Sequence, residues 1–223
     1  MSNEGHYLKI LNRPDVPPDV MEALLADRTA RKYHTVRRAL AAHPRTPRRE
    51  ALSLVSTLYW RDLAHLSADA RVHPEVRRAA DRDLARRLPE MALSERVDLA
   101  RSAGRGTLLL LRFDKDARVL QALLDNRLAT EPDLVQVAAR AETPPASLEA
   151  IAQHPRWGLR PSVRSALLRN PRLPVAVALS LLSRASASDL AGVRETPGIS
   201  RLLKACAETV LARRRKGPYH SSS

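Results

Sequence analysis

The stretch Leu40–Val55, LAAHPRTPRREALSLV, recurs at Leu167–Leu182 as LLRNPRLPVAVALSLL. The two copies align without a gap at an offset of 127 residues, and the same offset aligns residues 7–64 with residues 134–191. An ungapped match of this length within one chain is typical of stacked copies of one supersecondary unit. Each such unit buries its apolar face only against its neighbours. The repetition therefore predicts a single helical-repeat domain, which we place at residues 1–212.

Proline-led segments are the first of two helix types that alternate along the chain. In each segment the residues at +3, +4, +7 and +8 from a proline are mostly apolar, which is the pattern of one stripe on a helix. The segments begin at Pro17, Pro47, Pro144 and Pro174. We place these prolines at the first helical position, where the missing N–H costs nothing. Thr46, Thr130 and Thr143 then stand where an N-cap hydroxyl would accept a bond from the first turn.

The second helix type follows the pattern V-x-x-A-L-x-x-[NH]. It occurs at Val36–His43, Val119–Asn126 and Val163–Asn170. The closing Asn or His tolerates the left-handed conformation that often ends a helix, and the prolines at positions 44 and 171 prevent continuation. We therefore expect each of these segments to end in a left-handed residue.

The two patterns together predict an all-α chain, because no alternating run of strand-forming residues appears. Helices are expected near 4–12, 17–27, 32–43, 47–57, 60–67, 74–88, 94–103, 106–112, 116–126, 131–141, 144–154, 161–170, 174–184, 187–193 and 198–214. Their stripes predict a core that includes Leu24, Leu40, Leu54, Leu148, Ile151, Leu167 and Leu181. The basic and serine-rich tail, residues 213–223, is expected to be disordered.

The net charge of +14 is the strongest indication of a partner in the sequence. The excess is uneven: residues 1–88 carry +6, residues 89–156 carry −1 and residues 157–223 carry +9. Nearly all of the cations are arginines, whose fork-shaped guanidinium suits carboxylate and phosphate. An Ala-, Arg- and Pro-rich composition would also explain the preference for Arg over Lys, but it does not explain the excess over acids.

Arginines recur beside the valine that opens a second-type helix, or its looser relative at His73. They are Arg37, Arg38, Arg77, Arg78, Arg118 and Arg164. If these helices line a concave face, the arginines would repeat along it and grip an acidic partner. Alternatively, each arginine would pair with a nearby acid in the next repeat, with Asp81, Asp83, Asp114, Asp116 and Asp125 as candidates.

Several stretches resemble known helical repeats. Residues 40–55, 138–155 and 165–182 are similar to the leucine-rich repeat variant, whose units read LxxNPxTPxxVLxxLA. Residues 113–126, FDKDARVLQALLDN, also resemble the second helix of a HEAT repeat. The resemblance covers most of residues 7–193, with a poor fit at 60–112. It implies a right-handed α-α superhelix and no chemistry. The cysteines of the iron–sulfur cluster known in one variant protein are absent here, so no metal or cofactor is carried over.

The function expected from these features is a non-catalytic scaffold that binds an acidic partner, most simply a protein. Direct, sequence-nonspecific nucleic-acid binding is the alternative. A DNA-glycosylase activity is a third possibility, since bacterial alkylpurine glycosylases share the HEAT-like architecture. Its stacking group would be Trp60, Trp157, Phe113 or one of the four tyrosines, and among these Trp60 departs from the repeat because it aligns with Ala187. No catalytic, phosphate-loop or metal-ligand motif appears, so we expect no enzyme activity.

The compartment is expected to be the cytoplasm, without a membrane span. The first residues lack the apolar core of a signal peptide, and the longest strongly apolar stretch, residues 173–183, is too short to cross a bilayer. A single cysteine, Cys206, rules out an internal disulfide framework and suits a reducing compartment.

Overall fold

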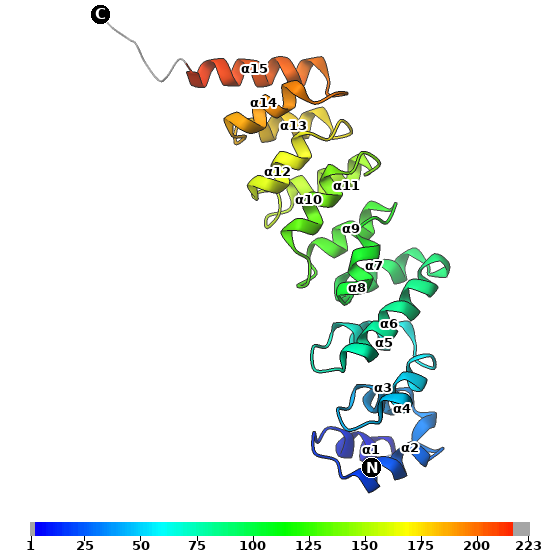
Figure 1. Ribbon diagram of the computed structural model, residues 1–223. Helices are drawn as coiled ribbons and strands as arrows, with labels where there is room; N and C mark the ends of the chain where they lie inside the picture. Colours follow the sequence, from blue (N-terminus) through cyan, green and yellow to red (C-terminus); the bar gives the residue numbers. More distant parts are fainter. Residues whose placement is uncertain (1–2, 216–223) are drawn as a thin grey trace, which may run out of the picture. The chain divides into compact units, whose positions relative to one another are not determined.

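The computed structural model describes residues 3–215, and this part of the chain is helical without a strand (Figure 1). The α-helices are α1 (Asn3–Leu11), α2 (Pro18–Ala26), α3 (His34–Ala42), α4 (Arg48–Val55), α5 (Trp60–Ala68), α6 (Pro74–Arg87), α7 (Leu93–Ser102), α8 (Arg105–Leu111), α9 (Ala117–Leu124), α10 (Glu131–Ala139), α11 (Pro145–Gln153), α12 (Pro161–Leu168), α13 (Val175–Leu182), α14 (Ala187–Glu195) and α15 (Arg201–Arg215). Two short 3-10 helices, η1 (Ala30–Lys32) and η2 (Leu88–Glu90), complete the set for these residues.

The helices predicted from the sequence are all present, and each boundary lies within three residues of its predicted place. The all-α fold class is therefore confirmed for the described residues. The two 3-10 helices were not anticipated, since segments of three residues carry no period that a pattern could reveal. Helix α15 reaches position 215, slightly past the expected domain end at 212, and the rest of the predicted tail lies outside the described residues.

The chain divides into two compact units, the first ending at Leu111 and the second beginning at Arg112. Helices α1–α8 belong to the first unit, and α9–α15 belong to the second. The expectation that residues 1–212 form a single domain stays a prediction.

The sequence duplication extends to the helices themselves. At the offset of 127 residues, α2, α4 and α5 coincide at both ends with α11, α13 and α14. Helices α3 and α6 begin at the positions that correspond to the starts of α12 and α15, and α1 matches α10 to within one residue. The repeated element is therefore a set of six helices, and each unit contains one copy. Helices α7, α8 and α9 lie between the copies in the sequence.

Within each copy the helices pack in pairs. In the first unit α3 packs on α4 and α5 packs on α6, while α1, α3 and α5 contact one another in succession and α4 contacts α6. In the second unit α10 packs on α12, α14 packs on α15, and α13 packs on both α12 and α15. In each copy the first, third and fifth helices therefore contact one another in a row. In the first copy this row consists of α1, α3 and α5.

The fourth and sixth helices of each copy contact each other, but the residues at corresponding positions are charged in the first copy and apolar in the second. In the first copy, Nε of Arg48 on α4 lies 3.3 Å from the carboxylate of Glu75 on α6. The corresponding residues on α13 and α15 are Val175 and Leu202, which are 38% and 58% exposed. An exposed ion pair of the first unit is therefore replaced by two apolar side chains in the second.

A recurring turn connects many of the helices. The first residue of the turn accepts two hydrogen bonds. Its side chain accepts one from the backbone N–H two residues later, and its own carbonyl accepts one from the backbone N–H three residues later. The first residues are His43, Asp69, Asn126, His154 and Asn170. The turn needs no left-handed residue: the backbone of His43 has φ −72° and ψ 132°, so the predicted left-handed ending is wrong there.

The predicted helix starts also need correction. Pro17, Pro47, Pro144 and Pro174 have extended ψ angles between 132° and 146°, which places them at the N-cap, one residue before the helix. Thr46 and Thr143 therefore precede the cap, and the hydroxyl of Thr143 donates to the carbonyl of Val137 instead. Thr130 is the N-cap of α10, but its hydroxyl donates to Asp133.

The core consists of Leu, Val and Ala side chains between the paired helices. All seven predicted core residues are buried, so that prediction is confirmed. Trp157 is the largest fully buried side chain, and its indole N–H donates to the carbonyl of Leu124 at 2.8 Å. Over residues 3–215, none of the helices has the length and apolar character needed to cross a bilayer.

Candidate functional site

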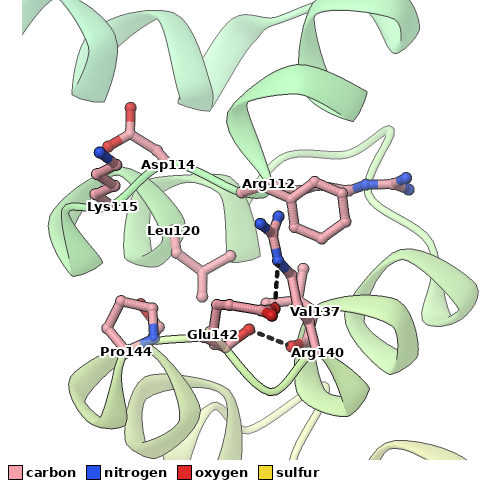
Figure 2. Close-up of a pocket in the computed structure, with 11 residues that line it drawn as sticks. Arg112, Asp114, Lys115, Leu120, Val137, Arg140, Glu142 and Pro144 are labelled. Atoms are coloured by element: carbon pink, nitrogen blue, oxygen red, sulfur yellow. Dashed lines mark hydrogen bonds and ion pairs between the residues drawn. The ribbon is translucent and has the colours of Figure 1, made fainter.

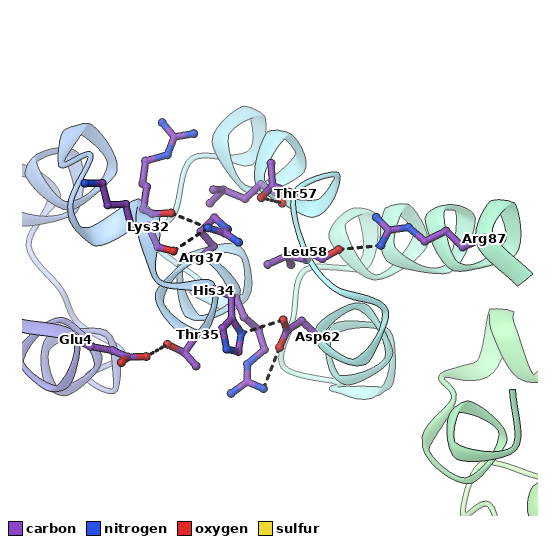
Figure 3. A network of polar contacts seen from close by, with 12 residues as sticks. Glu4, Lys32, His34, Thr35, Arg37, Thr57, Leu58, Asp62 and Arg87 are labelled. Carbon is purple, nitrogen blue, oxygen red and sulfur yellow. Dashed lines mark hydrogen bonds and ion pairs between the residues drawn. The ribbon is translucent and has the colours of Figure 1, made fainter. Parts of the chain in front are cut away.

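Arg37 and Arg164 occupy corresponding positions on α3 and α12, and both bind other groups of the same chain. Nη1 of Arg37 donates to the carbonyls of Arg31 at 2.8 Å and Lys32 at 3.2 Å, which joins η1 to α3 (Figure 3). The side chain of Arg164 is 12% exposed, and its Nη2 lies 4.0 Å from the carboxylate of Asp189. Both Nε atoms are buried. These contacts make the two arginines part of the packing.

Arg38 lies at the surface of α3 and is held there by a buried acid. Its Nη1 is 3.3 Å from one carboxylate oxygen of Asp62, and Nδ1 of His34 is 3.4 Å from the other (Figure 3). The carboxylate is only 6% exposed, whereas the side chain of Arg38 is 40% exposed. A guanidinium has five N–H donors in a fixed fork. Arg38 therefore keeps donors that face outward while Asp62 fixes its position.

Arg77 and Arg78 lie on α6, outside the row formed by α1, α3 and α5. The Nε of Arg77 is buried without a hydrogen-bond partner, whereas Arg78 is exposed. Within the described part of the chain, neither arginine forms an ion pair. Arg118, in the second unit, is bound by the adjacent Asp116 through two bonds of 3.0 and 2.9 Å. The hydrogen bonds and the charge of Asp116 raise the pKa of the Arg118 guanidinium.

Four of the six candidate arginines lie in the first unit and two in the second. Within the first unit, the candidate arginines lie on two helices, Arg37 and Arg38 on α3 and Arg77 and Arg78 on α6. Arg38 and Arg164 face Asp62 and Asp189 on later helices, which were not among the candidate acids. Arg118 pairs with a candidate acid, Asp116, but this acid lies in its own segment and not in the next repeat. Arg38 lines a cavity.

That cavity is a groove of about 760 Å³ on the row of α1, α3 and α5 in the first unit. Its wall is mixed: apolar side chains from all three helices line it together with Arg38, Arg71, His43 and His65 and one carboxylate, that of Asp69. Arg71 binds this carboxylate at 2.8 Å. The other lining residues are Leu8, Leu11, Asn12, Pro14, Thr35, Ala39, Ala42, Pro44, Leu66 and Val72.

The corresponding face of the second unit is occupied by an arginine. Ala42 and His65 of the first copy correspond to Arg169 and Gly192 in the second. The guanidinium of Arg169 lies over Gly192, so that a methyl group there would come within 2.7 Å of Nε. Arg38 corresponds to Ser165, which hydrogen-bonds Asp189. The first copy therefore has an arginine-bearing groove, and in the second copy the arginine at the position of Ala42 lies against the corresponding helix at Gly192.

Three acids that form ion pairs with arginines share one position, the third residue of a helix. Asp62, Asp133 and Asp189 lie there on α5, α10 and α14, and each faces an arginine from a preceding segment. At this position a carboxylate also suits the positive end of the helix dipole. This role was not predicted from the sequence, although Thr130 and Ser186 stand three residues before two of these acids, which is the signal of a capping box.

Trp60 also has a structural contact. Its indole N–H donates to Glu95 of α7 at 3.1 Å, and the guanidinium of Arg61 lies 5.0 Å from the ring centre. The side chain is partly buried rather than presented as a free stacking platform. Among residues 3–215, no group of three or more His, Cys, Asp and Glu side chains is placed to hold a metal ion.

Comparison with family models, curated proteins and solved structures finds no match for this chain. The chemistry of the groove and the difference between the two copies therefore carry the functional argument.

Proposed function

We propose that the chain is a non-catalytic scaffold that binds an acidic protein partner, and that its helix pairs form the right-handed superhelix of HEAT-like or leucine-rich-repeat-variant proteins. The groove on α1, α3 and α5 is the observation that carries the proposal. Its wall holds two arginines, bound by Asp62 and Asp69, together with two histidines, and its apolar side chains suit a peptide. A surface of this kind recognises an extended segment that carries Asp or Glu.

Arg38 is the anchor of the proposed site. Asp62, which also contacts His34, holds the guanidinium of Arg38 in place before a partner arrives, so little side-chain entropy is lost on binding. Its outward N–H groups can bind a carboxylate of the partner side by side. The groove volume, about 760 Å³, lies within the range in which proteins commonly enclose a ligand or a peptide side-chain cluster.

The second copy supplies a test that separates the groove from bulk charge. Ala42→Arg reproduces the residue found in the second copy and should cover the groove, although it adds a positive charge. We expect a labelled glutamate-rich peptide, followed by fluorescence anisotropy, to bind the wild type and to bind both Arg38→Ala and Ala42→Arg at least about tenfold more weakly. Ser165→Ala, at the position matching Arg38, is the control and should leave binding unchanged.

Stronger binding by Ala42→Arg would show that charge alone drives the interaction, and it would contradict the proposed groove. A glutamine-rich peptide of the same length measures the apolar contribution. Equal binding of the two peptides would contradict an acidic partner.

Nucleic-acid binding is the alternative proposal, and the net charge of +14 supports it together with exposed arginines on α6. Arg78 and Arg82 stand one helical turn apart there, and neither forms an ion pair among the described residues. If about five phosphates are neutralised, log K should fall with log salt at a slope of roughly −4 to −5 for duplex DNA. Replacing Arg78 and Arg82 by Ala should reduce the slope by about one per lost contact.

Anisotropy with a labelled duplex at two salt concentrations tests this alternative. If Ala42→Arg leaves the affinity for the duplex unchanged while the Arg78 and Arg82 substitutions lower it, nucleic acid is favoured over the protein partner. Absence of duplex binding at low salt would exclude it.

A further inference from the structure

The second unit contains a separate cavity of about 270 Å³ between α9, α10 and α11 (Figure 2). The side chain of Leu120 lies between Lys115 on one side and Arg140 on the other. Val137 and Pro144 add to an apolar floor, while the segment 112–115 forms the opposite wall. This volume is small for a drug-sized ligand and suits one side chain or a small molecule.

Polar groups without partners collect at this cavity. Ser147 is 1% exposed, lines the cavity, and its hydroxyl has no hydrogen-bond partner. Nε of Arg112, another lining residue, is likewise buried and unpaired. Five side-chain atoms of the described residues are in this state, and these are two of them. Both groups can donate a hydrogen bond, and a guanidinium N–H can only donate.

The duplicated copy shows that Ser147 is not required by the fold. Its counterpart on α2 is Val20, and the neighbouring Thr143 corresponds to Val16. The adjoining ion pair is kept in both copies, as Arg13 with Asp15 at 3.5 Å and as Arg140 with Glu142 at 3.1 Å. A buried hydroxyl without a partner is unfavourable where valine would serve. An acceptor on a bound molecule would satisfy this hydroxyl.

The charges and the aromatic ring at the cavity indicate the class of ligand. Phe113 is held between the guanidinium groups of Arg112 and Arg140, at 4.6 and 4.8 Å from the ring centre. Three cations and two acids line the cavity, and Lys115 is exposed without an ion pair among the described residues. Arg112 and Arg140 are already bound by Asp133 and Glu142. A negatively charged acceptor therefore fits the unpaired donors and the ammonium of Lys115, and a short aliphatic tail fits the floor of Leu120 and Val137.

We propose that this cavity binds a small carboxylic acid with a short aliphatic tail, through its carboxylate to Ser147 and the cationic wall. The site is distinct from the groove of the first unit and does not depend on the function proposed for it.

Titration of the full chain with valerate, followed in ¹H–¹⁵N spectra, tests the proposal. We expect saturable changes in the backbone signals of Phe113, Thr143 and Ser147 and in the Nε–H signal of Arg112. Ser147→Val should keep the fold, as Val20 does in the first copy, and should weaken valerate binding about tenfold or more, since a hydrogen bond to a charged group is lost. Lys115→Gln, at an exposed position, should also weaken it without affecting folding.

The controls are chosen to separate the carboxylate from its tail. Valeramide keeps the tail but lacks the charge, and inorganic phosphate has charge but no tail; both should bind more weakly than valerate. Val20→Ser introduces the hydroxyl into the first copy, which lacks the wall formed by 112–115, and should create no second site. The proposal is overturned if valerate causes no saturable change, if Ser147→Val binds it equally well, or if valeramide or phosphate matches it.

Discussion

Arg164 and Asp189 face each other between α12 and α14 with both side chains nearly buried, the Nη2 atom lying 4.0 Å from the carboxylate. Burial by itself would raise the pKa of Asp189. Hydrogen bonds from Ser186 and Ser165, together with the charge of Arg164, outweigh burial and lower the pKa overall. The folded protein therefore favours the carboxylate form of this residue.

The lowered pKa predicts how Asp189 contributes to stability with pH. Its folded pKa lies below the ordinary value of 3.8, so the charged form stabilises the fold at all pH values above 3.8. The contribution is lost as the pH falls from 3.8 through the lower, folded pKa. Asp189→Asn should therefore lower the melting temperature near pH 7, and the difference from the wild type should shrink below pH 3.8. A difference that grows toward acid would refute this assignment.

A buried ion pair in the second unit should be costly to break. Nη1 of Arg112 lies 3.0 Å from the carboxylate of Asp133, and the two side chains are 15% and 2% exposed. Asp133→Ala leaves Arg112 unpaired and removes the bonds to Thr130, so unfolding in urea should show a loss of about 3–5 kcal/mol. Asp125→Ala removes an exposed acid and should change stability by less than about 0.5 kcal/mol. Equal effects of the two substitutions would contradict the buried pair.

Alanine substitution should reduce stability much more at a buried leucine than at an exposed one. Leu148 on α11 is fully buried, whereas Leu179 on α13 is 39% exposed. Leu148→Ala should reduce the free energy of unfolding by about 2–5 kcal/mol, because it removes contacts and leaves a cavity. Leu179→Ala should have a much smaller effect. Denaturant midpoints at constant slope measure both, and a silent Leu148→Ala would remove this residue from the core.

Two glycines provide a matched pair of substitutions. A methyl group at Gly104 would lie 2.5 Å from the backbone carbonyl of Ser67, which cannot easily move. At Gly192 the nearest atoms belong to the flexible end of Arg169. Gly104→Ala should therefore cost about 1–3 kcal/mol, as overpacking does, whereas Gly192→Ala should only displace the arginine. Thermal melting of the two variants distinguishes them, and a Gly192→Ala variant that melts lower than Gly104→Ala would contradict the contact.

The helices could be predicted because the information is local. The stripes that follow Pro17 or Pro144 and the V-x-x-A-L pattern at Val36 depend on a helical period within one segment. The details of the caps could not be read in the same way. Whether Pro47 stands inside the helix or just before it depends on a single ψ angle, and both placements satisfy the proline ring.

The candidate site was less predictable because it depends on contacts between helices. Arg37 and Arg38 are neighbours in the sequence, yet one binds carbonyl groups of η1 and the other reaches the groove. Nothing in the pattern around them reveals η1. The occupied face of the second unit likewise depends on Arg169 lying over Gly192, residues that belong to different helices.

The contrast between Arg48–Glu75 and the matching Val175 and Leu202 also bears on how the chain reaches its native state. Two copies of six similar helices in one chain create the risk that a helix docks on the wrong copy during folding. Docking of α4 on α15 would set Arg48 against Leu202, and docking of α13 on α6 would set Val175 against Glu75. Each exchange would set a charged side chain against an apolar one. In the native arrangement these positions hold two opposite charges in the first copy and two apolar side chains in the second. This difference favours docking of each helix within its own copy.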